Sequence, residues 1–300
     1  MFTVFASLLV GVVTGRVGGR RVADAAGHLL SVGLVVLLFV MGVRLGASDA
    51  VLADLDRIGA FAFALSFGSV AGSVVCAYAV RDVLPSFDAD GDVAGAEGDS
   101  HTFTLLVVAS LVAGAAFGAL FLPADALSLV ERATSLSLAG LLFAVGVGLG
   151  ADGALVSQLR TLGPRVLALP VAVAVGSVAG ALGVGVLLGM SGSAAAAVGA
   201  GFGWYSLSAV IITDTAGVHL GSLAFLANVF RELLTLLCLP FVVHHFGRAA
   251  GIAPGGATTM DVTLPAIKRS AGRGAVVPAF VTGAVLSSMV PLLVPALLAF

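Results

Sequence analysis

Charged residues are scarce in this chain. They make up 10% of its 300 residues, whereas soluble domains typically carry about 25%. Apolar residues account for 59%, and the mean hydropathy is +1.16. So little charge excludes an ordinary soluble domain, and no nucleic-acid partner is expected. The composition therefore predicts an all-α integral membrane protein that crosses a lipid bilayer.

Cysteines and paired catalytic groups are lacking as well. The two cysteines, Cys76 and Cys238, each lie inside an apolar run and are not spaced like metal ligands, so neither a disulfide framework nor a metal site is expected. An intramembrane enzyme would need a nucleophile beside a base, and Ser206 and Ser208 have no convincing histidine partner in the adjacent spans. The sequence therefore predicts a protein that is not an enzyme and holds no cofactor.

Long apolar runs, by contrast, are plentiful. A helix needs ~20 residues to cross a hydrocarbon core of ~30 Å, and about eight runs approach that length. A ninth apolar stretch, 193–212, is interrupted by glycines and serines and is set apart from them. The eight expected spans cover roughly residues 2–17, 28–47, 58–80, 102–122, 134–150, 165–189, 221–243 and 275–299.

The basic residues set the expected orientation. With eight spans and the N-terminus outside, ten arginines and lysines fall in inside loops and two in outside loops, as the positive-inside rule requires. Both termini then face outside. If 193–212 crossed the membrane completely, the basic loop 244–274 would lie outside instead. The charge pattern therefore predicts that 193–212 is a re-entrant or broken segment.

A second irregular segment follows within that basic loop. The string GGATTMDVTLP, residues 255–265, combines glycines, threonines, an aspartate and a proline. Such backbone is tolerated at membrane depth only where protein shields it or where it lines water. A re-entrant or broken segment near 254–266 is the prediction, and a plain cytoplasmic loop is the alternative.

The chain also contains an internal repeat. LFVMGVRLGAS, residues 38–48, matches LFAVGVGLGAD, residues 142–152, at seven of eleven positions, and GSVAGS at 68–73 matches GSVAGA at 176–181. The two copies, about 34–80 and 138–189, lie three predicted spans apart, so one copy is inverted relative to the other. Inverted repeats are typical of secondary transporters. We therefore expect one transmembrane transporter domain over residues 1–300.

One segment departs from the apolar pattern. Residues 82–99 carry six carboxylates and no basic residue. Such a stretch is typical of a solvated chain without a core of its own. We expect an acidic flexible loop over residues 82–100.

Three polar residues lie inside the seventh apolar run. Asn228 and Arg231 are three positions apart and Asn228 and Glu232 are four apart, so all three share one helical face. Polar groups inside a span usually face the bundle interior or a water-filled cavity. Either an Arg231–Glu232 pair ties helices together, or the three residues line a polar transport cavity.

The string GFGWYSLS, residues 201–208, holds the only tryptophan beside one of two tyrosines. Trp204 and Tyr205 would be ordinary as anchors at the membrane interface. Flanked by glycines and by the hydroxyls of Ser206 and Ser208, they can instead hold an ammonium group by cation–π attraction. This second interpretation predicts a cationic substrate.

Further candidate residues lie in the second irregular segment and after the first repeat. Asp261 and Thr259 supply a carboxylate and a hydroxyl within GGATTMDVTLP. Asp49 follows the first repeat copy, near the counterpart of Asp152 in the second. Asp49 is either part of a site or a solvated residue at the end of a span.

Together these motifs resemble the lysine exporter LysO family of bacteria and archaea. The strings that carry the resemblance are GFGWYSLS at 201–208, NVFREL at 228–233 and GATTMDVTLP at 256–265. The resemblance covers essentially the whole chain and is strongest after residue 195. It implies an exporter of L-lysine and its toxic analogue thialysine in the plasma (inner) membrane, with eight spans and both termini outside.

Intramembrane acidic residues are important in that family. The motif matches carry this role over most strongly to Glu232 and Asp261 and most weakly to Asp49. Arg44, within the first repeat copy, is unexpected beside a pathway for cations.

The resulting hypothesis is proton antiport. Glu232 binds the side-chain ammonium of lysine from the inside and exchanges it for a proton from the outside. A sodium-coupled carrier of a small organic anion is the alternative, because paired broken segments also coordinate Na⁺. The oligomeric state stays open, a homo-oligomer included.

Overall fold

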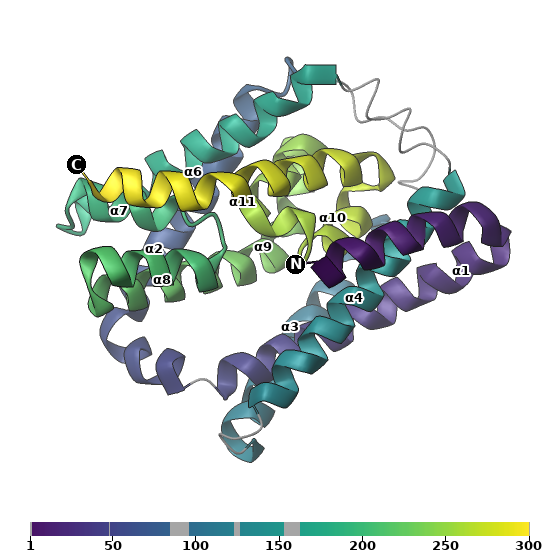
Figure 1. Cartoon of the computed structure of the whole chain (residues 1–300), viewed down its shortest axis with the longest axis horizontal. Coiled ribbons are helices and arrows are strands. Elements are labelled where there is room, and N and C mark those ends of the chain that lie inside the picture. The colour runs from purple at the N-terminus through teal and green to yellow at the C-terminus, as the bar shows by residue number, and fades with distance from the viewer. Residues whose placement is uncertain (1, 48, 85–95, 123–126, 153–162, 300) are drawn as a thin grey trace. The chain divides into compact units, whose positions relative to one another are not determined.

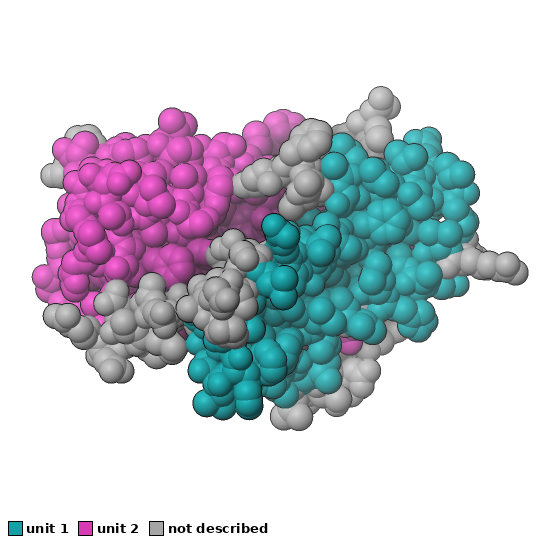
Figure 2. All heavy atoms as spheres, turned by 60° about the horizontal axis from the view of Figure 1, so that its bottom comes forward, with its two compact units in different colours: residues 1–52, 91–161 teal, residues 53–90, 162–300 magenta. Residues whose placement is uncertain are grey.

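The computed structural model describes residues 2–47, 49–84, 96–122, 127–152 and 163–299 (Figure 1). Nearly all of these residues are helical, and none within these ranges forms a strand. This agrees with the predicted all-α class. The chain divides into two compact units, one of residues 1–52 and 91–161 and the other of residues 53–90 and 162–300 (Figure 2). A single transporter domain over residues 1–300 stays a prediction.

The first unit consists mainly of three helices. They are α1 (Phe2–Gly46), α3 (Ala96–Phe121) and α4 (Leu127–Asp152). At Gly19 the backbone of α1 leaves the helical region, with φ 67° and ψ −169°, and the helix doubles back (Figure 1). The two arms of α1 therefore contain the predicted spans 2–17 and 28–47, and the intervening loop is largely helical.

Glycines set the packing in this unit. In the first arm of α1, Gly11 and Gly15 lie against the backbone of Phe143 and Val147 in α4. Small residues of this kind let helix backbones approach closely. In the second arm, the backbone of Phe39 and Val43 lies equally close to Gly114 and Gly118 of α3.

These two sets of contacts correspond to each other. Phe39 and Val43 precede Phe143 and Val147 by 104 positions, which is the offset of the first repeat match. Gly11 precedes Gly114 by 103 positions. The repeated motifs therefore make equivalent contacts, and the correspondence extends to the first arm of α1 and to α3, where no string match was found. The inverted orientation of the copies stays a prediction.

The second unit contains most of α2 and the remainder of the chain after residue 162. Gly247, with φ 86°, interrupts α9 near its end. The elements are α2 (Asp49–Ala79), η2 (Gly163–Leu167), α6 (Ala168–Leu187), α7 (Gly192–Gly199), α8 (Tyr205–Ala216), α9 (Val218–Ile252), η3 (Ala253–Met260), α10 (Leu264–Ala271), η4 (Arg273–Ala275) and α11 (Val276–Leu298).

The two segments of the second repeat match pack against each other. The GSVAG strings of α2 and α6 meet, with Gly72 against the backbone of Gly176 and Gly68 against that of Gly180. The hydroxyl of Ser69 donates a hydrogen bond to the carbonyl of Ser177 at 3.3 Å. The repeated sequence is therefore a helix–helix contact of the small-xxx-small kind.

Both predicted irregular segments interrupt helices. In the first, α7 and α8 are separated by residues 200–204, and Figure 1 shows α8 returning toward the end of the unit from which α7 starts. In the second, the tight η3 helix and a turn at 261–263 precede α10. The prediction of two broken segments, near 193–212 and 254–266, is confirmed. Their position relative to a membrane stays a prediction.

The long apolar helices agree with a membrane protein. Five described stretches are long and apolar enough to cross a bilayer: Val22–Val40, Ile58–Ala79, Gly163–Leu187, Val218–Met260 and Arg273–Leu298. The shorter apolar helices Ala6–Gly19, Val112–Phe121 and Arg132–Gly148 coincide with the other predicted runs. The eight-span topology stays a prediction.

The acidic loop predicted over residues 82–100 lies mostly outside the described residues. Its last five residues, 96–100, form the start of α3 (Ala96–Phe121), and the flexibility of the loop stays a prediction. Alanine and glutamate favour a helix at that point.

The contact between the repeated motifs predicts a large effect of one added methyl group. In Gly176→Ala the new Cβ collides with the backbone of Gly72, so we expect the free energy of unfolding to fall by about 1–3 kcal/mol, as for an overpacked core. Gly183 lies on the same helix with nothing within 4 Å of its Cβ position, so Gly183→Ala is the matched control. Thermal unfolding of the detergent-purified variants measures both. Equal melting temperatures for the two variants would contradict the contact.

Candidate functional site

The guanidinium of Arg231 lies at the centre of the second unit. It projects from the middle of α9, and its side chain is 2% exposed. Nε donates to the carbonyl of Pro254 at 3.0 Å, and Nη2 donates to the carbonyl of Ala253 at 3.3 Å. Nη1 donates to the hydroxyl of Ser177 at 2.6 Å, and Nη2 also donates to the hydroxyl of Ser73 at 3.2 Å. One side chain thus joins α9 to η3, α6 and α2.

The two serines are held in place by their own hydrogen bonds. Ser177 donates its hydroxyl proton to the carbonyl of Gly199, at the end of α7, at 2.7 Å. Ser73 donates to the carbonyl of Ser69 at 2.7 Å. Each hydroxyl therefore presents a lone pair to Arg231. All four hydrogen bonds of the guanidinium among the described residues go to neutral oxygen atoms.

Asn228 performs a similar task for the first broken segment. Its Oδ1 accepts the backbone N–H of Gly203 at 2.7 Å. Its Nδ2 donates to the carbonyl of Val198 at 3.3 Å and lies 3.5 Å from the hydroxyl of Ser208. The buried side chain of Asn228 therefore satisfies backbone groups that the break between α7 and α8 leaves without helical partners.

The two broken segments also touch each other. The backbone N–H of Ala257 donates to the carbonyl of Phe202 at 2.8 Å. Gly256 has φ 58°, and a Cβ there would meet the carbonyl of Phe202 and lie 3.1 Å from Nη2 of Arg231. Only glycine combines this dihedral angle with so close an approach. The two breaks and Arg231 thus form one structure.

The acidic candidates differ in environment. Glu232 follows Arg231 on α9 and is 2% exposed. Asp261 is half-buried just beyond the apolar stretch 218–260, and its Oδ1 accepts the N–H of Val262 at 2.6 Å. Burial raises the pKa of Asp261 from the ordinary 3.8 to about 6. Asp261 is therefore able to gain and lose a proton near neutral pH.

The hydroxyl-bearing candidates separate into buried and exposed groups. Ser208 is buried and donates to the carbonyl of Trp204 at 2.8 Å, whereas Ser206 is exposed. The hydroxyl of Thr259, which has one proton to donate, lies 2.8 Å from the carbonyl of Gly256 and 2.8 Å from that of Ala279. Thr259 thus links η3 to α11.

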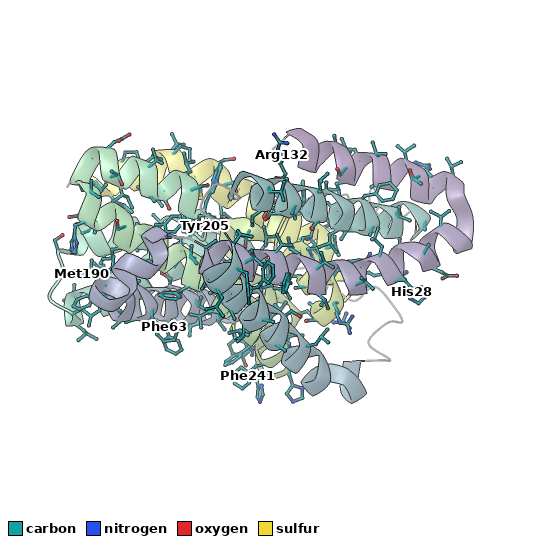
Figure 3. The ribbon with its side chains drawn as sticks, turned by 90° about the horizontal axis from the view of Figure 1, so that it is seen from below. His28, Phe63, Arg132, Met190, Tyr205 and Phe241 are labelled. Atoms are coloured by element: carbon teal, nitrogen blue, oxygen red, sulfur yellow. The ribbon has the colours of Figure 1, made fainter. Side chains whose placement is uncertain are left out.

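The aromatic pair of the first break is half-buried. The ring of Tyr205 packs edge-on against Phe225 of α9, with centroids 5.4 Å apart, and Figure 3 labels Tyr205. Trp204 stands immediately before α8. Asp49 opens α2, and its side chain lies outside the described residues.

Sequence reasoning missed the two serines that bond to Arg231. The signal was present, because Ser73 ends the repeat string GSVAGS and Ser177 is the serine of its counterpart GSVAGA. Hydroxyls next to closely packed glycines are well placed to face a neighbouring helix.

Comparison with known families identifies the chain. The family model described as "Lysine exporter LysO" matches residues 5–98 and 108–298, which is nearly the whole chain. The chain belongs to the lysine exporter LysO family. The resemblance seen in the three sequence strings is thereby confirmed, and with it a membrane transport family in place of an enzyme class.

Two curated relatives support this membership. The chain is 36% identical over 171 residues to "Lysine exporter LysO" of Escherichia coli (strain K12), a match that covers 56% of each chain. It is 41% identical over 97 residues to a "Putative lysine exporter" of Haemophilus influenzae (strain ATCC 51907 / DSM 11121 / KW20 / Rd), covering 32% of this chain and 49% of the relative. The chain thus spans about half the length of the curated relatives it matches. No solved structure matches it significantly.

The bonds of Asn228 predict a specific loss of stability. In Asn228→Ala the buried N–H of Gly203 loses its acceptor, which typically costs about 1–3 kcal/mol. We expect a lower melting temperature and faster proteolysis between α7 and α8. The exposed Ser206 on α8 provides the control variant Ser206→Ala. Similar melting temperatures for both variants would show that Asn228 does not support the break.

Proposed function

We propose that this protein exports L-lysine, and toxic analogues such as thialysine, across the plasma (inner) membrane by exchange for protons. Membership in the lysine exporter LysO family supports the substrate, and both relatives carry lysine export in their names. The observation that carries the mechanism is the buried carboxyl of Glu232, which lies on α9 next to Arg231, the residue whose guanidinium contacts the second broken segment. Both termini are proposed to lie outside.

Glu232 is the proposed partner of a lysine ammonium. Burying a carboxylate costs several kcal/mol in lost hydration, and a nearby cation lowers that cost. The side-chain ammonium of lysine brings a cation to this buried carboxyl when lysine enters from the cytoplasm. When lysine leaves, a proton must replace it before the site can return, and this requirement couples export to proton entry.

Asp261 is the proposed proton-exchanging residue. Its pKa of about 6 lies within the pH range that cells meet. Above that value the carboxyl is ionised and attracts lysine, and below it the carboxyl is protonated and neutral. Protonation from the outside therefore promotes the release of lysine.

The two broken segments are the proposed moving parts. Irregular backbone at the centre of a bundle and inverted repeats around it are typical of alternating-access carriers. The backbone hydrogen bond between Ala257 and Phe202 joins the two broken segments. A movement that separates the segments breaks that bond, and a movement of η3 away from α9 also breaks the bonds from Arg231 to the carbonyls of Ala253 and Pro254.

The sodium-coupled carrier of an organic anion predicts a positive site, and Arg231 does bond to neutral oxygens. An amino acid also carries a carboxylate, so the same arginine is compatible with lysine. Family membership favours lysine over the anion.

Transport by the reconstituted protein tests the proposal. Proteoliposomes loaded with labelled lysine and given an inward proton gradient should release lysine, and a protonophore should abolish the effect while a sodium ionophore should not. Glu232→Gln removes the cation-binding charge and should lower the rate at least about tenfold, or ~1.4 kcal/mol in the barrier. Asp214 is an exposed carboxylate of the same unit, so Asp214→Asn is the control and should transport like wild type. Lysine release driven by sodium, or undiminished in Glu232→Gln, would refute the mechanism.

The pH dependence tests the role of Asp261. With the inside held at pH 7.5, export should rise as the outside pH falls through about 6, because the carboxyl becomes protonated there. Asp261→Asn removes the titrating group and should abolish this step. The measurement is the initial rate of lysine release between about pH 5 and 8. A step that persists unchanged in Asp261→Asn would assign it to another group.

A further inference from the structure

We infer that Arg231 binds the α-carboxylate of the exported amino acid, by exchanging its bond to Ser73 for that carboxylate. The inference rests on the proposed function and goes beyond it. It assigns to one residue the group that distinguishes an amino acid from a simple diamine.

The first observation is the set of partners of the guanidinium. An arginine has five N–H donors, and Arg231 makes four hydrogen bonds, with Nη1 contributing only one of its two N–H groups. One donor on the Nη1 side is therefore available in the described structure. The adjoining bond from Nη2 to Ser73 is 3.2 Å long, whereas that from Nη1 to Ser177 is 2.6 Å. Ser73 is the partner that a carboxylate displaces most readily.

The second observation is that Ser73 loses little by this exchange. Its hydroxyl donates its only proton to the carbonyl of Ser69 at 2.7 Å, and that bond does not depend on Arg231. A carboxylate placed between Nη1 and Nη2 accepts two N–H groups in the bidentate geometry that arginine favours. The exchange therefore replaces one long hydrogen bond to a neutral hydroxyl with two hydrogen bonds in which donor and acceptor are both charged.

The third observation is electrostatic. Arg231 is 2% exposed, and its four partners are neutral. A buried charge is favourable only when an opposite charge compensates for the lost hydration. The carboxylate of the substrate supplies that charge while it is bound.

The remaining sides of the guanidinium are already enclosed. The carbonyls of Ala253 and Pro254 occupy the Nε and Nη2 edge, and Gly256 lies so close to that edge that a Cβ would stand 3.2 Å from Nε. The second broken segment thus fixes the orientation of the guanidinium. The Nη1 and Nη2 atoms face Ser177 of α6 and Ser73 of α2, and the carboxylate is proposed to bind on this side.

Formal charge is consistent with this assignment. Arg231, Glu232 and Asp261 together carry one net negative charge when both carboxyls are ionised, and lysine carries one net positive charge. In this proposal lysine presents its carboxylate to Arg231 and its side-chain ammonium to Glu232. Cadaverine, which is lysine without its α-carboxylate, leaves Arg231 without a counter-charge. The site is therefore expected to reject diamines.

Equilibrium binding of lysine and cadaverine to the detergent-purified protein tests the inference. Two hydrogen bonds to the carboxylate are gained and one to Ser73 is given up, so the net gain is about one charged hydrogen bond. Such a bond contributes about 1.5–3 kcal/mol, which predicts that wild type binds lysine about tenfold to a hundredfold more tightly than cadaverine. Arg231→Gln should bind lysine and cadaverine with about equal affinity. Lysinamide, whose carboxylate is neutralised, should behave like cadaverine in both proteins.

Arg231 joins four elements, so Arg231→Gln also removes contacts that hold the fold together. A second variant therefore keeps the arginine and changes Ser73. Ser73→Asp places a carboxylate beside Nη2, where that of the substrate is proposed to bind. It should abolish the preference for lysine while binding of cadaverine is retained. Ser73→Asn matches Ser73→Asp in size but adds no charge, so it measures the effect of packing alone and should retain more of the preference for lysine than Ser73→Asp does. This pair separates occupation of the carboxylate site from loss of packing.

Each outcome decides between the claims. If wild type binds neither lysine nor cadaverine, the proposed function falls and the inference falls with it. If wild type binds both equally, or if Ser73→Asp keeps the full preference for lysine, the inference alone is overturned. Loss of the preference in Ser73→Asp, with its retention in Ser73→Asn, supports the inference even where Arg231→Gln does not fold.

Discussion

Buried backbone that leaves the helical conformation needs hydrogen-bond partners, and the second unit depends on two side chains that supply them. Asn228 accepts the N–H of Gly203 in the first break, and Arg231 donates to the carbonyls of Ala253 and Pro254 in the second. The two side chains are three positions apart on α9, so they share a face. One helix therefore supports both breaks, each through a different side chain.

The sequence predicted much of the fold for identifiable reasons. Apolar runs of span length indicated the helices, and glycines and hydroxyls within apolar surroundings indicated the two breaks. Helix ends were less well predicted, since α1 stays helical through most of the region between its two apolar runs, and in α9 a second helical stretch follows the interruption at Gly247 and extends to Ile252. Polarity marks where a helix leaves an apolar environment, and a helix can continue beyond that point.

For the site, sequence spacing brought Asn228, Arg231 and Glu232 together but left the partners of Arg231 unidentified. Those partners, Ser73 and Ser177, are 158 and 54 positions away along the chain. Helical periodicity relates residues within one helix and carries no information on which helices meet. Only the repeat contained that information, because matched small residues mark the faces by which α2 and α6 approach.

The contact between α2 and α6 has a further property. In the repeat, Gly68 corresponds to Gly176 and Gly72 corresponds to Gly180. In the structure the contacts are crossed, because Gly68 meets Gly180 and Gly72 meets Gly176. This reciprocal pattern is the signature of an isologous interface, in which one surface pairs with a second copy of itself. The same pattern holds for Gly11 with Phe143 and Gly114 with Phe39 in the first unit. These contacts thus have the geometry that two identical half-length chains would use to pair with each other.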